Sequence, residues 1–198
     1  MAAVGQSVRS GPVARHWRLW LLVASTTVLG LAVAGLLASP RVVAPPTVVL
    51  HPSWAMGYAS VDELQAAADL AVVARVSDVV AEGPDLVVPE IPATVFRLAV
   101  ERTLKGAPGP TILVVQTGGL LHGTHFMMEG DPLMRSGDRY LLYLARVPSG
   151  PYVERYGTDV YFVLGGPDGR FAVAPSGQLT PLGQVVLPAG TTVERLYP

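Results

Sequence analysis

Two histidines, two methionines and two carboxylates lie within one short segment, residues 122–131, and form the strongest candidate for chemistry in this sequence. They are His122, His125, Met127, Met128, Glu129 and Asp131. Imidazole with thioether ligands suits copper, and imidazole with carboxylate ligands suits zinc. An H-x-x-H pair on a loop does not fix both rings on one face, as it would on a helix. The segment is therefore either a copper or zinc site or a polar loop that covers one mouth of a barrel.

Other catalytic chemistry has little support in the sequence. The chain contains no cysteine, which excludes disulfides, thiolate metal sites and a cysteine nucleophile. It also lacks the G-x-S-x-G turn of serine hydrolases. A carbohydrate-active enzyme needs two positioned carboxylates, and the candidates are Glu90, Glu101, Glu129, Asp131, Asp138 and Asp159. Nothing in the sequence pairs them, so we expect no catalytic residue and no cofactor, and a carbohydrate-active enzyme remains one alternative.

These side chains depend for their positions on a series of predicted strands. Residues 94–104 alternate between apolar and polar side chains, which is typical of a half-buried strand. Further strands are expected over residues 70–81, 111–116, 139–145, 152–156, 159–164, 170–173 and 184–187. Ser60 and Glu63 predict a capped short helix over 61–69. Residues 118–136 are expected to form a long loop, and Gly165–Gly169 to form the turn of a hairpin. The sequence predicts a mainly β fold, a small barrel or sandwich, with one short helix.

The order of these segments resembles a broad group of uncharacterised, exported bacterial proteins of the actinobacterial type. The resemblance rests on a strand after Ala68-Asp69, a V-E-x-x-L-K-G strand end at residues 100–106, a Q-x-G-G strand end at 116–119, and G-D-x-Y-L-L-Y-L at 137–144. It covers roughly residues 61–174. It implies a small OB-like β-barrel, closed or partly open, and it supplies no catalytic residue.

Aromatic residues and net charge bear on what such a barrel could bind. The aromatic residues of the C-terminal half are Tyr140, Tyr143, Tyr152, Tyr156, Tyr161 and Phe162. Aromatic faces on an OB-like barrel can stack bases or sugars, and the alternative is packing across strands. Residues 39–198 carry 15 acidic and 11 basic residues, because the other three arginines precede the apolar run described below. An acidic surface argues against nucleic acid as a partner, so packing is the favoured role.

A long apolar run, Leu19–Ala38, indicates where the protein is located. It holds about twenty residues without a charge, and a helix of that length spans about 30 Å, the thickness of a bilayer's hydrocarbon core. Trp17 and Trp20 lie at its start, where aromatic belts form. The run has no polar face, which argues against a buried helix of a soluble protein. We therefore expect a transmembrane signal-anchor helix with the lipid bilayer as its partner.

The charges around this run predict its orientation. Arg9, Arg15 and Arg18 precede it, whereas no acidic residue does. Positive flanks stay cytoplasmic, so the N-terminus is expected inside and residues 39–198 outside. The alternative is a secreted protein, because Ala32–Ala34 has the A-x-A pattern of a signal-peptide cleavage site. Both interpretations export the same domain.

The expected organisation has five segments in chain order. They are a cytoplasmic segment over residues 1–18, the signal anchor over 19–38, a proline-rich spacer over 39–56, an OB-like barrel over 57–174 and a C-terminal extension over 175–198. The function expected from this organisation is a non-enzymatic binding or interaction module of the cell envelope, with an unknown envelope protein or ligand as its partner. The alternatives are an envelope metal-binding protein and a carbohydrate-active enzyme.

Overall fold

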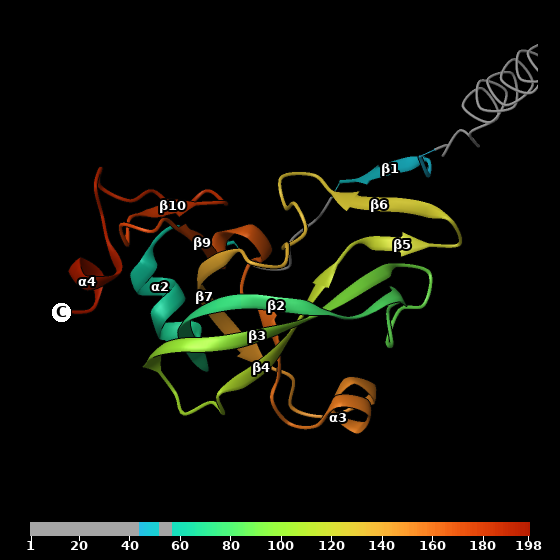
Figure 1. The fold of residues 1–198 in the computed structure, drawn as a ribbon, viewed down its shortest axis with the longest axis horizontal. Coiled ribbons are helices and arrows are strands. Elements are labelled where there is room, and N and C mark those ends of the chain that lie inside the picture. The colour runs from blue at the N-terminus through green and yellow to red at the C-terminus, as the bar shows by residue number, and fades with distance from the viewer. Residues whose placement is uncertain (1–43, 52–56) are drawn as a thin grey trace, which may run out of the picture. The chain divides into compact units, whose positions relative to one another are not determined.

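The computed structural model describes residues 44–51 and 57–198, and this part of the chain is mainly β. In chain order the elements are β1 (Thr47–Leu50), α2 (Val61–Ala67), β2 (Leu70–Pro84), β3 (Pro92–Lys105), β4 (Thr111–Thr117), β5 (Gly119–Leu121), β6 (Thr124–Met128), β7 (Arg139–Arg146), α3 (Pro151–Tyr156), β8 (Val160–Val163), the 3-10 helix η1 (Gly166–Gly169), β9 (Arg170–Val173), β10 (Leu179–Pro181) and α4 (Val193–Leu196) (Figure 1).

Five of the strands close into a barrel, as the sequence predicted. The strands β2, β3, β4, β8 and β7 are hydrogen-bonded in that order, and β7 pairs again with β2 to complete the ring. The pairing between β4 and β8 is parallel, whereas the pairings of β7 with β8 and with β2 are antiparallel. Irregular register at four places between β2 and β3 bends this long hairpin, as bulges do.

The barrel interior is built from the alternating residues of its strands. Side chains that point to one face of each strand form a continuous buried cluster: Leu70, Val72, Ala74 and Val76 of β2, Phe96 and Leu98 of β3, Ile112 and Val114 of β4, Tyr140, Leu142 and Leu144 of β7, and Tyr161 of β8. Because successive residues of a strand face opposite sides, the other set of side chains is left to contact the elements outside the barrel.

Helices cover two parts of the outer surface. Leu64 of α2 packs with Val73 of β2 and Tyr143 of β7 in a second buried cluster, to which the C-terminal residues Leu179 and Val193 also belong. On another face, Tyr152 of α3 packs against the outward side chains of β3 and β4 in a third cluster. The helix α2 begins as its sequence predicted, since the Ser60 hydroxyl accepts a hydrogen bond from the Glu63 amide at 3.2 Å.

Four local predictions were wrong. Residues 152–156 form the helix α3 and not a strand. Residues 184–187 form no strand, and the last strand is β10 instead. The Gly165–Gly169 segment is largely a 3-10 helix, and β8 and β9 pair with β7 and not with each other. The predicted long loop over 118–136 contains the strands β5 and β6, which pair as an antiparallel hairpin.

A second, three-stranded sheet has the order β1-β6-β5. Its outer strand β1 comes from the predicted proline-rich spacer and pairs with β6 in parallel. Figure 1 shows this sheet beside the far end of the β2–β3 hairpin, and β5 contacts both strands of that hairpin. The predicted transmembrane helix, Leu19–Ala38, lies outside the described residues. Within residues 44–51 and 57–198, no helix is long and apolar enough to cross a membrane.

Candidate functional site

The six candidate metal ligands occupy different positions along the β5–β6 hairpin and the segment after it. His122 lies in the hairpin turn with a positive φ of 49°. All of His125, Met127 and Met128 belong to β6. Because successive residues of a strand face opposite sides, His125 and Met127 lie on one face of the sheet and Met128 lies on the other. Among the described residues, no three His, Cys, Asp or Glu side chains come together in a way that could hold a metal ion. Binding of copper or zinc by this segment stays a prediction.

The two carboxylates of that set have separate partners. Glu129 follows β6 and lies 2.6 Å from Nδ1 of His51, at the end of β1. Asp131 is buried and forms an ion pair with Arg170, the first residue of β9. Burial raises the pKa of Asp131, and the charge of Arg170 opposes that shift. The two acids therefore serve two different contacts.

Arg170 and Gln116 hold the segment after β6 against one end of the barrel. The Arg170 guanidinium donates to the carbonyl of Pro132 at 2.6 Å and to Oε1 of Gln116 at 3.4 Å. The same Gln116 oxygen accepts from the Met134 amide at 3.0 Å, and the Gln116 amide donates to the Pro132 carbonyl. Met134 belongs to the buried cluster of the barrel interior. This polar network therefore has a structural role. The sequence analysis missed it because no sequence motif includes Arg170.

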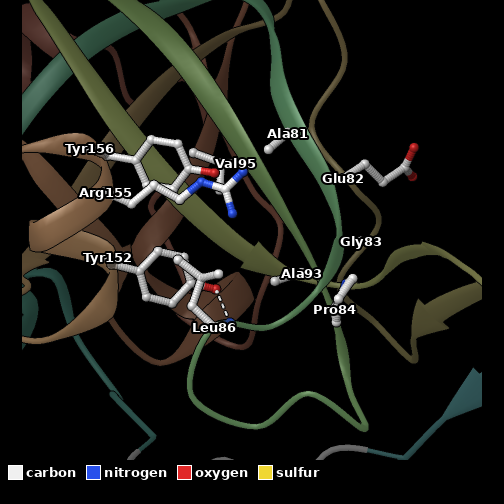
Figure 2. A pocket seen from close by; sticks show the side chains of 10 residues that line it. All are labelled: Ala81, Glu82, Gly83, Pro84, Leu86, Ala93, Val95, Tyr152, Arg155 and Tyr156. Atoms are coloured by element: carbon white, nitrogen blue, oxygen red, sulfur yellow. Dashed lines mark hydrogen bonds between the residues drawn. The ribbon is translucent and has the colours of Figure 1, made fainter.

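The candidate functional site is a pocket between the end of the β2–β3 hairpin and α3. Its volume is about 180 Å3. Figure 2 shows its walls: Ala81, Glu82, Gly83, Pro84 and Leu86 from β2 and the following turn, Ala93 and Val95 from β3, and Tyr152, Arg155 and Tyr156 from α3. The helix α3 lies in the connection between β7 and β8. The closed barrel thus sets the distance between the two sides of the pocket.

Tyr152 anchors α3 to the β2–β3 turn. Its side chain is buried, and its hydroxyl donates to Oδ2 of Asp85 at 2.7 Å. The other oxygen of Asp85 accepts from the amides of Val87 at 2.7 Å and Val88 at 2.9 Å. Burial, together with the hydrogen bond to Asp85, raises the pKa of Tyr152, so its hydroxyl stays a neutral donor. One carboxylate therefore orders both the turn and the wall of the pocket.

Arg155 and Tyr156 supply the polar groups of the pocket. The ring of Tyr156 stacks on that of Tyr152 with 6.3 Å between centroids, and the Arg155 guanidinium carbon lies 5.3 Å from the Tyr156 centroid. In Figure 2 the Arg155 guanidinium and the Tyr156 hydroxyl both point from α3 toward the strand wall. Neither group is hydrogen-bonded to another side chain or backbone atom in the part of the chain that the structure describes. Both remain able to donate to a ligand.

Five of the six aromatic residues named from the sequence divide between two roles, whereas Phe162 is 39% exposed. Tyr140, Tyr143 and Tyr161 are buried in the barrel and its outer layer, which is the expected packing role. Tyr152 and Tyr156 instead line the pocket. The signal that could have located the site was the pair of tyrosines one helical turn apart, which the prediction of a strand over 152–156 obscured. Arg155 lies between them and was not predicted as a site residue.

The composition of the pocket resembles that of small-molecule sites, although its volume of about 180 Å3 is below their usual range of about 300–1,000 Å3. Apolar side chains form most of its wall, and one cation and one hydroxyl converge on it, which is the common composition of a ligand site. Comparison of the sequence with protein-family models and with curated proteins finds no match.

Proposed function

We propose that this protein is a single-pass, membrane-anchored binding module of the cell envelope, with an extracytoplasmic OB-like barrel that holds a small ligand in the α3 pocket. The observation that carries the proposal is the pocket itself, where Arg155 and the Tyr156 hydroxyl converge beside apolar walls. The residues around it include no nucleophile activated by a base, so binding and not catalysis is the favoured role.

The order of the barrel strands supports the OB-like assignment. A ring of five strands with one parallel pairing, here between β4 and β8, fits the Greek-key barrel of that fold. OB-folds bind their ligands near the connection between their first two strands and the connection between their last two. In this chain those connections are the turn after β2 and the segment that contains α3. The pocket lies between them, where the fold favours a ligand.

The membrane anchor and the outward orientation rest on the amino-acid sequence. The run Leu19–Ala38 is long and apolar enough to span a bilayer, and three arginines precede it. The cleavable signal peptide is the alternative, and it leaves the same exported barrel.

Filling the pocket is expected to abolish binding of small ligands. A fragment library added to the full-length protein in detergent micelles should contain compounds that shift the backbone amide NMR signals of residues 81–86 and 152–156. Ala81 lines the pocket, so Ala81→Leu should remove these shifts because the larger side chain occupies the space. Ala67→Leu, the same change on the exposed surface of α2, is the control and should leave them intact. A library without a single pocket ligand would contradict the proposal.

Engineered cysteines are expected to report an extracytoplasmic barrel. Since the chain has no native cysteine, Ser149→Cys places one thiol in the exposed turn before α3. A membrane-impermeant maleimide should label this thiol on intact cells, whereas Ser7→Cys, on the other side of the predicted span, should react only after lysis. The labelled protein should sediment with membranes if the anchor is retained and appear in the medium if it is cleaved. Labelling of Ser7→Cys alone on intact cells would reverse the predicted orientation.

A further inference from the structure

We propose that the α3 pocket recognises a carboxylate that carries a compact apolar body, either a free acid or the C-terminus of a peptide. This inference rests on the proposed binding function of the same pocket and assigns the chemical class of its ligand.

The polar end of the pocket is suited to a single negative charge. Arg155 carries a planar set of N–H donors that matches the two oxygens of a carboxylate. The Tyr156 hydroxyl points toward the same wall of the pocket (Figure 2) and is a further donor. Within the described residues, no ion pair uses the Arg155 charge. A carboxylate placed between these groups would accept two or three hydrogen bonds, and it would supply the negative charge that Arg155 lacks.

Aromatic rings contact both donors, of which Arg155 is exposed to solvent and Tyr156 is half-buried. The Arg155 guanidinium carbon lies 5.3 Å from the centroid of the Tyr156 ring, and the Tyr156 ring stacks on that of Tyr152. Tyr152 is fixed by burial and by its hydrogen bond to Asp85. Such contacts reduce the conformational entropy that the side chains of the pocket lose when a ligand binds.

The nearby acidic groups do not neutralise this end of the pocket. The Glu82 carboxylate is turned away from it in Figure 2, and its Oε1 accepts a hydrogen bond from the Leu120 amide at 2.8 Å. Asp85 is occupied by Tyr152 and by the turn amides. Because Arg155 is the one cation among the described residues that line the pocket, a monoanion is favoured over a phosphate dianion.

The rest of the pocket favours an apolar body of limited size. Pro84, Leu86 and Val95 form its wall. A volume of about 180 Å3 is below the about 300–1,000 Å3 of pockets for drug-sized ligands. The adjoining turn adds the side chains of Val87 and Val88, which are 65% and 44% exposed. A short branched carboxylic acid fills the pocket, and the residue before a peptide C-terminus would extend over this turn.

Titration with matched probes tests the inference on the full-length protein in detergent micelles, by the same amide NMR signals. Isovalerate is expected to bind with a dissociation constant on the order of millimolar, the affinity usual for so small a ligand. Isovaleramide, which has the same shape without the charge, should bind at least about tenfold more weakly, because hydrogen bonds to charged groups are the stronger ones. N-acetyl-glycyl-valine and its C-terminal amide distinguish a peptide end from a free acid.

Variants separate recognition of charge from loss of the pocket. Arg155→Ala should weaken isovalerate at least about tenfold, and Tyr156→Phe by about two- to tenfold, the range of one hydrogen bond. Arg195→Ala, which removes an exposed arginine from α4, is the matched control and should have no effect. If neutral sugars or isovaleramide bind as well as isovalerate and Arg155→Ala changes nothing, the carboxylate inference is wrong while the pocket remains a binding site. If no carboxylate shifts the pocket signals at tens of millimolar, the inference is also overturned.

Discussion

Arg170→Met is expected to lower the free energy of unfolding by about 3–5 kcal/mol, the range measured when one partner of a buried ion pair is removed. The side chains of Arg170 and Asp131 are only 1% and 5% exposed. Without the guanidinium, the Asp131 carboxylate stays buried with no opposite charge, and the carbonyl of Pro132 loses a hydrogen bond of 2.6 Å. Chemical denaturation of the purified protein, followed by circular dichroism, measures the difference.

A double-mutant cycle distinguishes the ion pair from simple loss of packing. Asp131→Ala should be strongly destabilising for the same reason, and the double variant should cost clearly less than the sum of the two, because neither buried charge is then left alone. Arg97 and Asp78 provide the matched control: their ion pair spans 3.0 Å, but their side chains are 46% and 50% exposed. Arg97→Met should therefore cost no more than about 1 kcal/mol. Equal losses for Arg97→Met and Arg170→Met would rule out a structural role for the buried pair.

The buried pair of Asp131 and Arg170 illustrates which contacts a sequence pattern cannot predict. Asp131 attracted attention as a metal ligand because it follows two histidines and two methionines. Its actual partner is 39 positions further along the chain. Local spacing carries no information about such a contact, because the contact exists only after β9 has paired with β7. Buried polar pairs between residues far apart in the chain are therefore difficult to predict from the sequence.

The barrel strands were predictable because local pattern and burial agree in them. The alternation over residues 94–104 survives as β3, whose residues Phe96 and Leu98 face the barrel interior. The prediction failed at α3, where the tyrosines favour a strand but Pro151 occupies the first turn of a helix and Tyr152 is buried beneath it. It failed again at β5 and β6, because their sheet includes β1, which lies far earlier in the chain. Both failures involve segments whose conformation depends on distant partners.

The candidate pocket was only half visible in the sequence. Tyr152 and Tyr156 were named, but as packing residues, and Arg155 was not named at all. Their common role depends on a helical turn that brings Tyr152 and Tyr156 together and on the closed barrel that places α3 opposite the β2–β3 hairpin. The features that form the candidate pocket are thus tertiary, although Tyr152, Arg155 and Tyr156 are close together in the sequence.

The Q-x-G-G strand end acquires a physical meaning that leads to a second strong prediction. The chain leaves β4 through Gly118 and Gly119, whose φ values are 115° and 126°, a region that L side chains rarely adopt. A Cβ atom on Gly119 would lie 2.5 Å from the Thr94 hydroxyl and 2.9 Å from Oε1 of Glu82. Both positions are already used: the Thr94 hydroxyl donates to the Gly118 carbonyl, and Glu82 accepts from the Leu120 amide. An added methyl group therefore has no free space.

Gly119→Ala is accordingly expected to lower the free energy of unfolding by about 2–5 kcal/mol, the sum of backbone strain and overpacking. Gly123→Ala is the matched control. Its φ of 77° is also positive, but no atom lies within 4 Å of the added Cβ, so only the strain of about 1–2 kcal/mol should remain. Thermal and chemical denaturation of both variants measures the difference.

Since Glu82 also lines the α3 pocket, Gly119→Ala should in addition shift the amide signals of residues 81–86, whereas Gly123→Ala should not. Equal destabilisation by the two variants would mean that the close contact at Gly119 is relieved without cost.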